Sequence, residues 1–304
     1  MSRPLVIGSR GSKLALWQAE QARERLRMLH PQVDVHIEII KTTGDVKNDP
    51  LSVIGGKGVF TKELEDALLD GRIDIAVHSL KDLPTILPDG LSITAICERE
   101  DARDALVLRA GSENGSLLHL PVGAIVGTSS QRRLAQLKAL RSDVAVRDLR
   151  GNVDTRIRKL DEGQYDAVIL ASAGLVRLGL QERISARIAV SEMLPAVGQG
   201  AIAIETRSDN EFAVQSASPL DHRETRVACL AERAFLRSLG GGCQFPIAAH
   251  AVIESDLLRL EGLVAKPDGS EILRDSLSGT PEDPEALGSQ LADQLISRGA
   301  RELL

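Results

Sequence analysis

Apolar positions along the chain follow two different periods, which predicts strands and helices in alternation. Short apolar runs typical of buried strands occupy residues 5–7, 73–77, 91–96, 124–126 and 165–169. Residues 14–17 and 134–140 carry instead the spacing of helices with one apolar face. The alternation predicts an α/β fold with parallel-rich sheets covered by helices, and with strand-end loops that face a shared cleft.

Two parts of the chain repeat the same pattern. Residues 5–15 and 124–135 each read as a strand, a Ser- or Thr-rich turn and a helix. Residues 70–77 and 162–169 each close a helix at Gly and open a buried strand. Any strand and helix unit can look like this, but both repeats come in the same order with nearly the same offset. The pattern therefore favours two similar α/β domains.

The chain changes character after residue 218. A helix is expected over residues 223–239, then a glycine-rich loop with Cys243, alternating strands over 247–277 with a turn at 267–269, and a closing helix from Pro284. Upstream, residues 98–104 form a charged break, and the runs 187–193 and 200–206 are expected to be extended and to lead back to the first domain. We predict domain 1 over residues 1–98 with 199–218, domain 2 over 103–194, and a small α+β domain 3 over 221–304.

Composition narrows the class of protein. A chain of 304 residues with 43% hydrophobic content is long enough for two or three domains. Its three cysteines have no paired spacing, which favours a reducing compartment, and Cys97 and Cys229 are expected to be core residues. No signal-type stretch follows Met1, and no apolar run reaches membrane-spanning length. We therefore expect a soluble, cytoplasmic protein with no membrane contact.

Charge is unevenly distributed. The net charge of −6 and an aromatic content of only 2% argue against nucleic acid as a partner. Cations nevertheless gather between residues 132 and 159, where they are Arg132, Arg133, Lys138, Arg141, Arg147, Arg150, Arg156, Arg158 and Lys159. A local basic surface on an acidic protein indicates a discrete anionic ligand.

The two repeated turns are candidate anion sites. Ser12 and the Thr128-Ser129-Ser130 turn are placed to cap the helices that follow them, and helix N-termini suit carboxylates. Each turn has arginines beside it, and guanidinium groups pair with carboxylates bidentately. For one turn alone, plain capping with solvated arginines explains the pattern. Two facing turns, with Arg150 and Arg156 in addition, favour an anion-binding cleft.

Two further side chains are candidates for chemistry. Asp82 follows a buried strand and is expected to point into the cleft, where neighbouring cations keep it ionised and able to stabilise a cation formed during reaction. A structural pair with Lys81 is the alternative. Cys243 follows three glycines, which suits either an attachment point or an incidental thiol in a mobile loop. His78 is expected to be a packed, hydrogen-bonded side chain, and no Cys or His spacing suggests a metal.

Seven stretches, in order, resemble the porphobilinogen deaminase family over essentially the full chain. They are residues 9–18, 55–60, 78–84, 127–133, 149–156, 194–200 and 241–243. The resemblance implies two periplasmic-binding-protein-like α/β domains around a cleft, with a small α+β C-terminal domain. It implies a transferase of tetrapyrrole and haem biosynthesis that joins four porphobilinogen molecules head to tail, releases ammonia, and frees hydroxymethylbilane with water. Val53 departs from the pattern, since many members carry lysine there.

The same resemblance implies roles for individual residues. Cys243 would hold a covalent dipyrromethane cofactor through a thioether, and Asp82 would be the catalytic carboxylate. The residues implied to bind the cofactor are Lys81, Asp82, Thr128, Ser129, Ser130, Arg132, Arg133 and Arg156. Those implied to bind substrate are Arg10, Ser12, Gln18, Lys57, Phe60, Arg150, Gly151, Arg177 and Gln199. No metal is implied, and a monomer is expected.

Two other functions stay open on the residues alone. Two repeated α/β domains around an anion-lined cleft also describe a non-catalytic solute-binding protein for carboxylates. A transferase with a cysteine nucleophile is a further alternative, although the chain offers no evident His partner for the thiol. A stable pyrrolic adduct on the purified protein would separate both from the deaminase.

Overall fold

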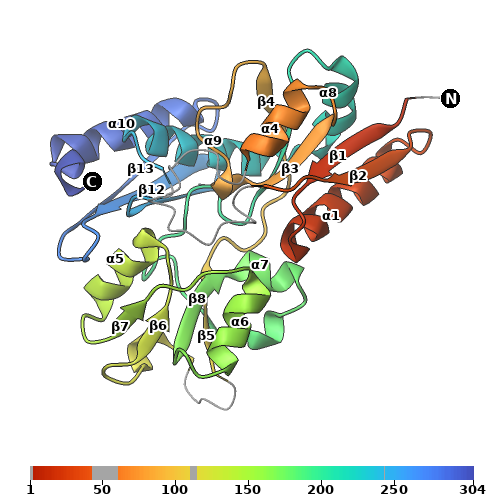
Figure 1. The fold of residues 1–304 in the computed structure, drawn as a ribbon. Coiled ribbons are helices and arrows are strands. Elements are labelled where there is room, and N and C mark those ends of the chain that lie inside the picture. The colour runs from red at the N-terminus through yellow and green to blue at the C-terminus, as the bar shows by residue number, and fades with distance from the viewer. Residues whose placement is uncertain (1–2, 43–60, 110–114, 243) are drawn as a thin grey trace. The chain divides into compact units, whose positions relative to one another are not determined.

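The computed structural model describes the chain except for residues 1–2, 43–60, 110–114 and 243 (Figure 1). The chain divides into two compact units, of which the first comprises Met1–Arg99 with Ala201–Arg226. The second comprises Glu100–Gly200 with Val227–Leu304. None of the helices in the described part is long and apolar enough to cross a membrane.

The first unit is built on a five-stranded sheet. Its strands are β1 (Leu5–Ser9), β2 (Val35–Ile39), β3 (Ile75–Ser79), β4 (Leu91–Ile96) and β10 (Ile202–Arg207), in the order β2-β1-β3-β10-β4. Its helices are α1 (Lys13–Leu29), α4 (Lys62–Leu69) and α8 (Glu211–Ala217), with the 3-10 turns η1 (Leu80–Asp82) and η4 (Ser218–Leu220). Apolar residues of α1 and α8 share one core cluster with the sheet, and those of α4 share another.

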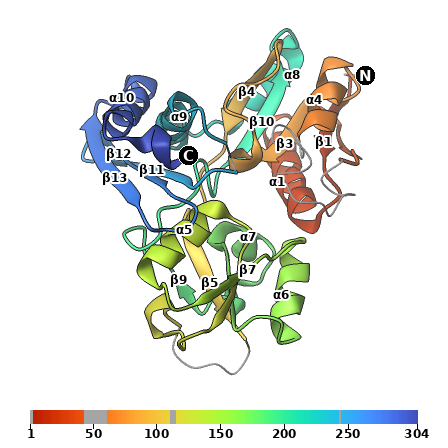
Figure 2. The ribbon, with the colours of Figure 1, turned by 60° about the vertical axis from the view of Figure 1, so that its left-hand side comes forward.

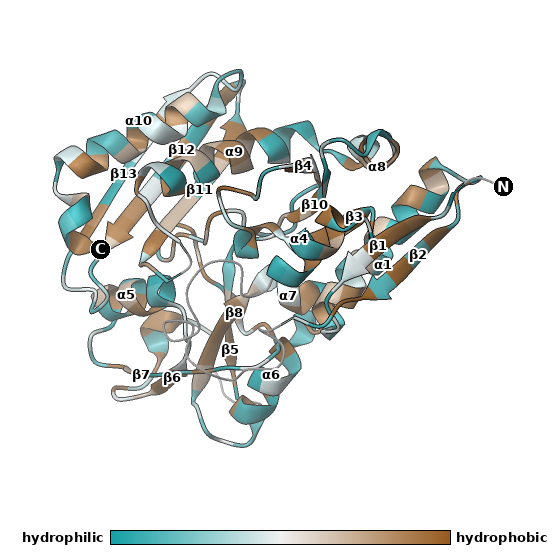
Figure 3. Cartoon of the chain, turned by 45° about the horizontal axis from the view of Figure 1, so that its top comes forward, coloured by the Kyte–Doolittle hydropathy of each residue, from teal (hydrophilic) through white to brown (hydrophobic). Residues whose placement is uncertain are grey.

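The second unit contains a sheet of the same size. Its strands are β5 (Asp104–Leu108), β6 (Ile125–Gly127), β7 (Ala145–Arg147), β8 (Ala167–Ala171) and β9 (Ala186–Arg187), in the order β7-β6-β8-β5-β9. The helical segments are α5 (Gln131–Leu140), α6 (Val153–Asp161), α7 (Ser172–Arg177), η2 (Leu117–His119) and η3 (Gln181–Arg183). Apolar residues dominate β5 and β8, while α5 and α6 alternate between apolar and polar positions (Figure 3).

The two sheets confirm the repeat predicted from the sequence. In the strand orders given above, the first two pairings of each sheet are parallel and the last two are antiparallel. The α/β class is therefore confirmed, whereas the prediction of parallel-rich sheets is wrong. Each sheet is mixed because β10 and β5 run against the strands beside them.

Local sequence signals explain why helices of the two units begin and end in the same way. The Ser12 and Ser130 side chains cap α1 and α5 by accepting hydrogen bonds from the backbone N–H groups of Ala15 and Arg133. Gly71 and Gly163 end α4 and α6 with φ values of 69° and 79°, which favour glycine. These caps and turns confirm the corresponding predictions.

The C-terminal part of the second unit is a small α+β layer. It consists of α9 (Arg223–Ser238, which belongs to this unit from Val227 on), β11 (Ile247–Glu254), β12 (Leu257–Ala265), β13 (Ile272–Gly279), α10 (Pro284–Ser297) and η5 (Ala300–Leu303). The three strands form an antiparallel sheet, and α9 and α10 lie over one face of it (Figure 2). This arrangement confirms the elements predicted after residue 218.

Helices α9 and α10 approach closely at Gly288. A Cβ atom built there would lie 2.2 Å from the backbone oxygen of Ala231 and 2.8 Å from the Cβ of Ala234. The other face of the small sheet packs against α5, where Ala248 and Leu263 share a core cluster with Ala135. The C-terminal layer is thus joined to the second sheet domain through a continuous apolar contact.

Two predictions about connecting segments are wrong. Residues 187–193 are not an extended run, because the backbone N–H groups of Glu192 and Met193 both bond the oxygen of Ala189 and so form a turn. The charged break also ends earlier than expected, since Asp104 is fully buried as the first residue of β5. Cys97 and Cys229 are buried, as predicted, and neither forms a disulfide, while the three-domain boundaries stay a prediction.

Candidate active site

Several residues singled out in the sequence lie outside the described part of the chain. They are Val53, Lys57, Phe60 and Cys243. The roles expected for them therefore stay predictions. The other candidate residues are placed, and each unit gathers its own group.

In the first unit, candidate residues follow the ends of β1 and β3. Arg10 comes directly after β1, and Ser12 caps α1. Gln18, on the first half of α1, is 2% exposed, and its Nε2 donates to Ser79 Oγ at 2.9 Å. Gln18 therefore helps to fix the end of β3, and the substrate contact expected for it stays a prediction.

Lys81 and Asp82 lie in the η1 turn that begins where β3 ends. The turn is tied to β10, because the Leu80 N–H donates to the backbone oxygen of Ala201 at 3.0 Å. Asp82 itself is exposed. His78, four residues earlier, is buried and bonds Glu205 through Nε2 at 2.9 Å, so its prediction as a packed, hydrogen-bonded residue is confirmed.

In the second unit, Arg132 and Arg133 converge on one carboxylate. Asp104 accepts hydrogen bonds from Arg132 Nη1 and Arg133 Nη2, each at 2.7 Å. Gln199 Nε2 donates to the same carboxylate at 2.8 Å and to the backbone oxygen of Ala102 at 2.7 Å. All four side chains are buried. Asp104 is not among the site residues predicted from the sequence, although an acid directly before the apolar run 105–108 is a signal of a buried charge.

The charges of this network do not cancel. Burial alone would raise the pKa of Asp104, but Arg132 and Arg133 outweigh it and hold the pKa of this carboxyl well below its usual range. Burial lowers the pKa of Arg132, Asp104 opposes that effect, and the charge of Arg133 adds to it. Two guanidinium groups and one carboxylate leave one positive charge, which a ligand carboxylate would neutralise.

The segment after the second sheet is held by three separate contacts. Arg177 Nη2 donates to the Gly200 oxygen at 2.6 Å, and Glu232 Oε2 accepts from the Gly198 N–H at 2.7 Å. The Gln199 side chain is fully buried, and it donates to the Ala102 oxygen and to Asp104. These bonds tie Gln199 to β5 and to the segment before it, and the substrate contact expected for Gln199 stays a prediction.

The loop after β7 brings together a third group. Ser129 Oγ donates to the Leu149 oxygen at 2.7 Å, and Arg156 Nε donates to the Gly151 oxygen at 2.7 Å. Arg150 pairs with Asp148 at 2.8 Å. Burial opposes ionisation of Asp148, but Ser129 and Arg150 hold the pKa of its carboxyl below the usual value. Thr128, buried at the end of β6, accepts from the Ser130 N–H at 3.2 Å.

We predicted one basic surface from the run of cations between residues 132 and 159. The structure does not show one. Arg132 and Arg133 are buried with Asp104. Three others have acidic neighbours, in the pairs Arg141–Asp143, Arg150–Asp148 and Arg158–Glu162. Local pairing therefore reduces the exposed positive charge that the sequence alone suggests.

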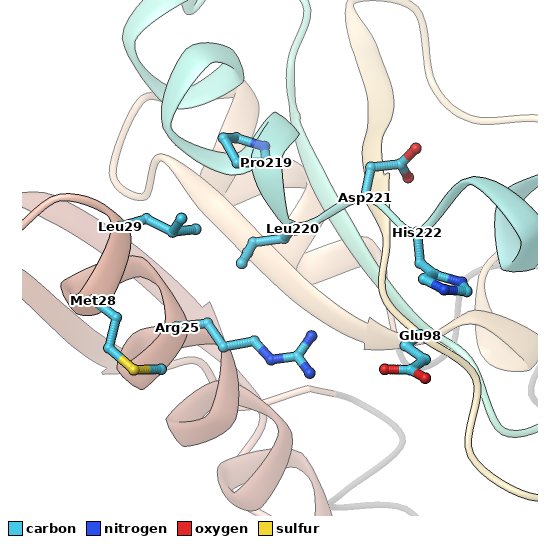
Figure 4. A pocket seen from close by; sticks show the side chains of 8 residues that line it. All are labelled: Arg25, Met28, Leu29, Glu98, Pro219, Leu220, Asp221 and His222. Atoms are coloured by element: carbon cyan, nitrogen blue, oxygen red, sulfur yellow. The ribbon is translucent and has the colours of Figure 1, made fainter.

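A hollow of about 360 Å³ in the first unit lies away from these groups (Figure 4). Its lining combines the apolar side chains of Met28, Leu29 and Leu220 with Arg25, Glu98 and His222. None of the candidate residues lines it. The hollow therefore adds nothing to the candidate active site.

Comparison with known proteins gives the same family on both parts of the chain. Residues 5–215 match the family model described as "Porphobilinogen deaminase, dipyromethane cofactor binding domain". Residues 226–297 match "Porphobilinogen deaminase, C-terminal domain". A porphobilinogen deaminase of Chromobacterium violaceum is 52% identical over 301 residues, covering 99% of this chain and 96% of the relative.

Solved structures show more distant likenesses. The VFT2 domain of BvgS from Bordetella pertussis aligns at 16% identity over 71% of this chain and 85% of that chain, with a TM-score of 0.42. YhfZ from Shigella flexneri aligns at 17% identity over 78% and 91%, with a TM-score of 0.38. The assignment rests on the sequence matches, which span both sheet domains and the C-terminal layer and disfavour a non-catalytic binding protein. The chain belongs to the porphobilinogen deaminase family, with its dipyrromethane cofactor and its place in tetrapyrrole biosynthesis.

Proposed function

We propose that this enzyme joins four porphobilinogen molecules head to tail with release of ammonia, and that Cys243 holds its dipyrromethane as a thioether. The observation that carries the proposal is the match to a cofactor-binding family model over the residues that include the Asp104 network. When bound, the dipyrromethane supplies the pyrrole carbon to which the first substrate unit is joined. A monomeric, cytoplasmic enzyme is part of the same proposal, and two buried cysteines without a disulfide, Cys97 and Cys229, suit a reducing compartment.

The described donors fit a ligand rich in carboxylates. Arg132 and Arg133 share one carboxylate between two guanidinium groups, so a ligand acid would complete the charge balance of the network. The N-terminus of α5 adds backbone N–H groups close to Thr128, Ser129 and Ser130. We assign these residues, together with Lys81 and Arg156, to the cofactor.

Asp82 is assigned the catalytic role. Loss of ammonia from porphobilinogen leaves a cationic methylene-pyrrolenine, and a fixed carboxylate stabilises that charge as it develops. The η1 turn supports this role because it is anchored at Leu80 to β10 and, through Ser79, to Gln18. Asp82 is exposed at the end of this anchored turn, where it could meet a substrate.

The remaining candidates are assigned to substrate and to the elongating chain. These are Arg10, Ser12, Gln18, Lys57, Phe60, Arg150, Gly151, Arg177 and Gln199. Arg150 supports the assignment because its Asp148 partner is exposed, so that exchange for a substrate carboxylate leaves no buried charge behind. Gln18 and Gln199 also bond Ser79 and Asp104, so they hold the η1 turn and the Asp104 network as well.

Intact-mass and peptide mass spectrometry of the purified native protein test this function. We expect a mass increment equal to a dipyrromethane without added ligand, located on the peptide that contains Cys243. A Cys243→Ser variant should lose both the increment and turnover, and Cys229→Ser serves as the matched control because that thiol is fully buried. An active enzyme with an unmodified Cys243 thiol would overturn the assignment.

A further inference from the structure

A buried carboxylate of the C-terminal layer bonds two separate backbone segments of the second unit. Glu232 lies on α9 and is 0% exposed. Its Oε1 accepts from the Ala251 N–H at 2.8 Å, and its Oε2 accepts from the Gly198 N–H at 2.7 Å. Ala251 lies on β11, the edge strand of the small sheet, and Gly198 lies in the segment after the second sheet. The roles discussed above for the active site do not include Glu232.

The turn at residues 198–200 depends on bonds from outside it. Gly198 and Gly200 have φ values of 70° and 90°, in the left-handed region that favours glycine. Glycine loses more conformational freedom on folding than any other residue, so two glycines in three positions do not fix this turn by themselves. Glu232 holds the turn at the Gly198 N–H, and Arg177 holds it at the Gly200 oxygen.

The residue between the two glycines extends these contacts to the Asp104 network. Gln199 Nε2 carries two hydrogens, and it donates to the Ala102 oxygen and to Asp104 Oδ1. The same Oδ1 accepts from Nε and Nη2 of Arg133. A shift of the turn would therefore withdraw a donor from the carboxylate that orients Arg133.

We propose that Glu232 is a positioning residue for Arg132 and Arg133. It fixes the turn at residues 198–200, and the turn in turn fixes the bond from Gln199 to Asp104. The carboxylate of Asp104 then holds both guanidinium groups in one arrangement. Each hydrogen bond of this route joins groups within the second unit.

The place of Glu232 in the chain gives this route its relevance to the reaction. Helix α9 ends at Ser238 and β11 begins at Ile247, so Cys243 lies between them in the sequence. Glu232 is on the first element and bonds the second, so it ties both flanks of the proposed attachment residue to the arginines proposed to bind the cofactor. This step rests on the proposed function. A role limited to satisfying two buried N–H groups would affect stability and leave the kcat of the loaded enzyme unchanged.

Glu232→Gln tests the positioning role. The amide keeps the shape of the side chain but has one acceptor oxygen, so one of the two N–H groups loses its partner. Asp166→Asn is the matched control, because Asp166 also accepts a backbone N–H, from Ile125 at 2.8 Å. Asp166 lies just before β8, whose other end pairs with Asp104.

Both variants are compared as protein that carries the cofactor mass. We expect the kcat of Glu232→Gln to fall by about ten- to a hundredfold with KM unchanged, since a misplaced group far from the chemistry can cost that much. Asp166→Asn should keep the wild-type kcat. A loaded Glu232→Gln enzyme with the wild-type kcat would overturn the positioning role.

A double-mutant cycle tests the route through Gln199 without any turnover. Gln199→Leu removes the next bond of the route, so the unfolding constant of Glu232→Gln with Gln199→Leu should rise less than the product of the two single rises. We expect the shortfall to be a factor between about 2 and about 100 in urea denaturation. Asp166→Asn with Gln199→Leu should give the full product. A full product in both pairs would show that Glu232 does not act through Gln199.

Amide hydrogen exchange of the wild type needs no variant. The Gly198 N–H belongs to a turn, yet its buried bond to Glu232 should protect it from exchange. Exchange as fast as that of an exposed amide would refute the first step of the route. The cycle and the exchange do not depend on the reaction, so their failure is distinguishable from failure of the proposed function, which a native protein without the dipyrromethane mass would show.

Discussion

Asp104 accepts two hydrogen bonds from Arg133, one from Nη2 at 2.7 Å and one from Nε at 3.1 Å. The side chains are 0% and 7% exposed, so the pair is removed from water. A buried pair of this kind adds little net stability over apolar side chains, but loss of one partner leaves an uncompensated charge. Several expectations depend on this pair.

Asp104→Asn should destabilise the protein strongly. The amide has nearly the same shape but leaves Arg132 and Arg133 without their counter-charge, so the free energy of unfolding should fall by about 3–5 kcal/mol. Urea denaturation measures this change. Asp148→Asn is the matched control, since Asp148 is 60% exposed with Arg150 and should cost about 0–1 kcal/mol. Equal losses in both variants would contradict the buried-charge account.

Low pH should weaken the pair of Asp104 and Arg133. The folded pKa of Asp104 is lowered, so its stabilisation is present above the unfolded pKa of about 3.9 and is lost as the pH falls towards the folded value. Below about pH 3.9 the wild-type unfolding constant should therefore rise more steeply than that of Asp104→Asn, by up to about tenfold per pH unit. Urea titrations at several acid pH values compare the two slopes, and identical slopes would show that Asp104 is not ionised in the folded state.

Arg132→Leu and Arg150→Leu should fail at different steps. Arg132 is buried with Asp104, so its loss should impair both folding stability and cofactor loading. Arg150 is half-buried and pairs with an exposed acid, so its loss should leave the cofactor mass unchanged and slow elongation. Intact-mass spectra resolve loaded protein and elongation intermediates. Two variants with the same mass distribution would refute the separate roles.

Asp82→Asn should abolish most turnover and keep the attached cofactor. The amide preserves the shape of the exposed side chain and removes the charge that stabilises a developing cation, which corresponds to a loss of about 10²–10³ in kcat. Stability should change by less than about 0.5 kcal/mol, because Asp82 is at the surface. Turnover close to that of the wild type would exclude Asp82 as the catalytic carboxylate.

Gly288→Ala should weaken the C-terminal layer. The added methyl group would meet the Ala231 oxygen at 2.2 Å, so α9 and α10 must move apart, at a cost of about 1–3 kcal/mol. Gly242→Ala is a suitable control for unfolding measurements, since nothing lies within 4 Å of its new atom. Thermal unfolding should separate the two variants; a Gly288→Ala protein as stable as the control would mean that the helices can shift freely.

Features set by neighbouring residues could be predicted from the sequence. The Ser12 and Ser130 caps depend on groups three residues away, and Gly71 and Gly163 act within their own turns. Such signals are local, so they can be recognised in the sequence without knowledge of the fold. They were sufficient to identify the paired α/β domains and to place Asp82 at the end of a buried strand.

Features set by distant partners could not be predicted. Asp104 bonds Arg133, which is 29 positions away in the chain, and Gln199, which is 95 positions away. The residues next to Asp104 in the sequence therefore do not indicate that it is buried. Glu205 was missed for the same reason, since its His78 partner lies 127 positions away. Gln18 and Gln199 lie in stretches that resemble the family, but their bonds to Ser79 and Asp104 could not be predicted from those stretches.

The place of β10 has a consequence for synthesis of the chain. β10 lies between β3 and β4, yet it is made after all five strands of the second sheet. The N-terminal sheet therefore stays divided, with β4 detached, until residue 207 has left the ribosome, whereas the sheet of β5 to β9 is complete by residue 187. Although domains usually fold in the order of their synthesis, the middle of this chain is expected to fold before its beginning.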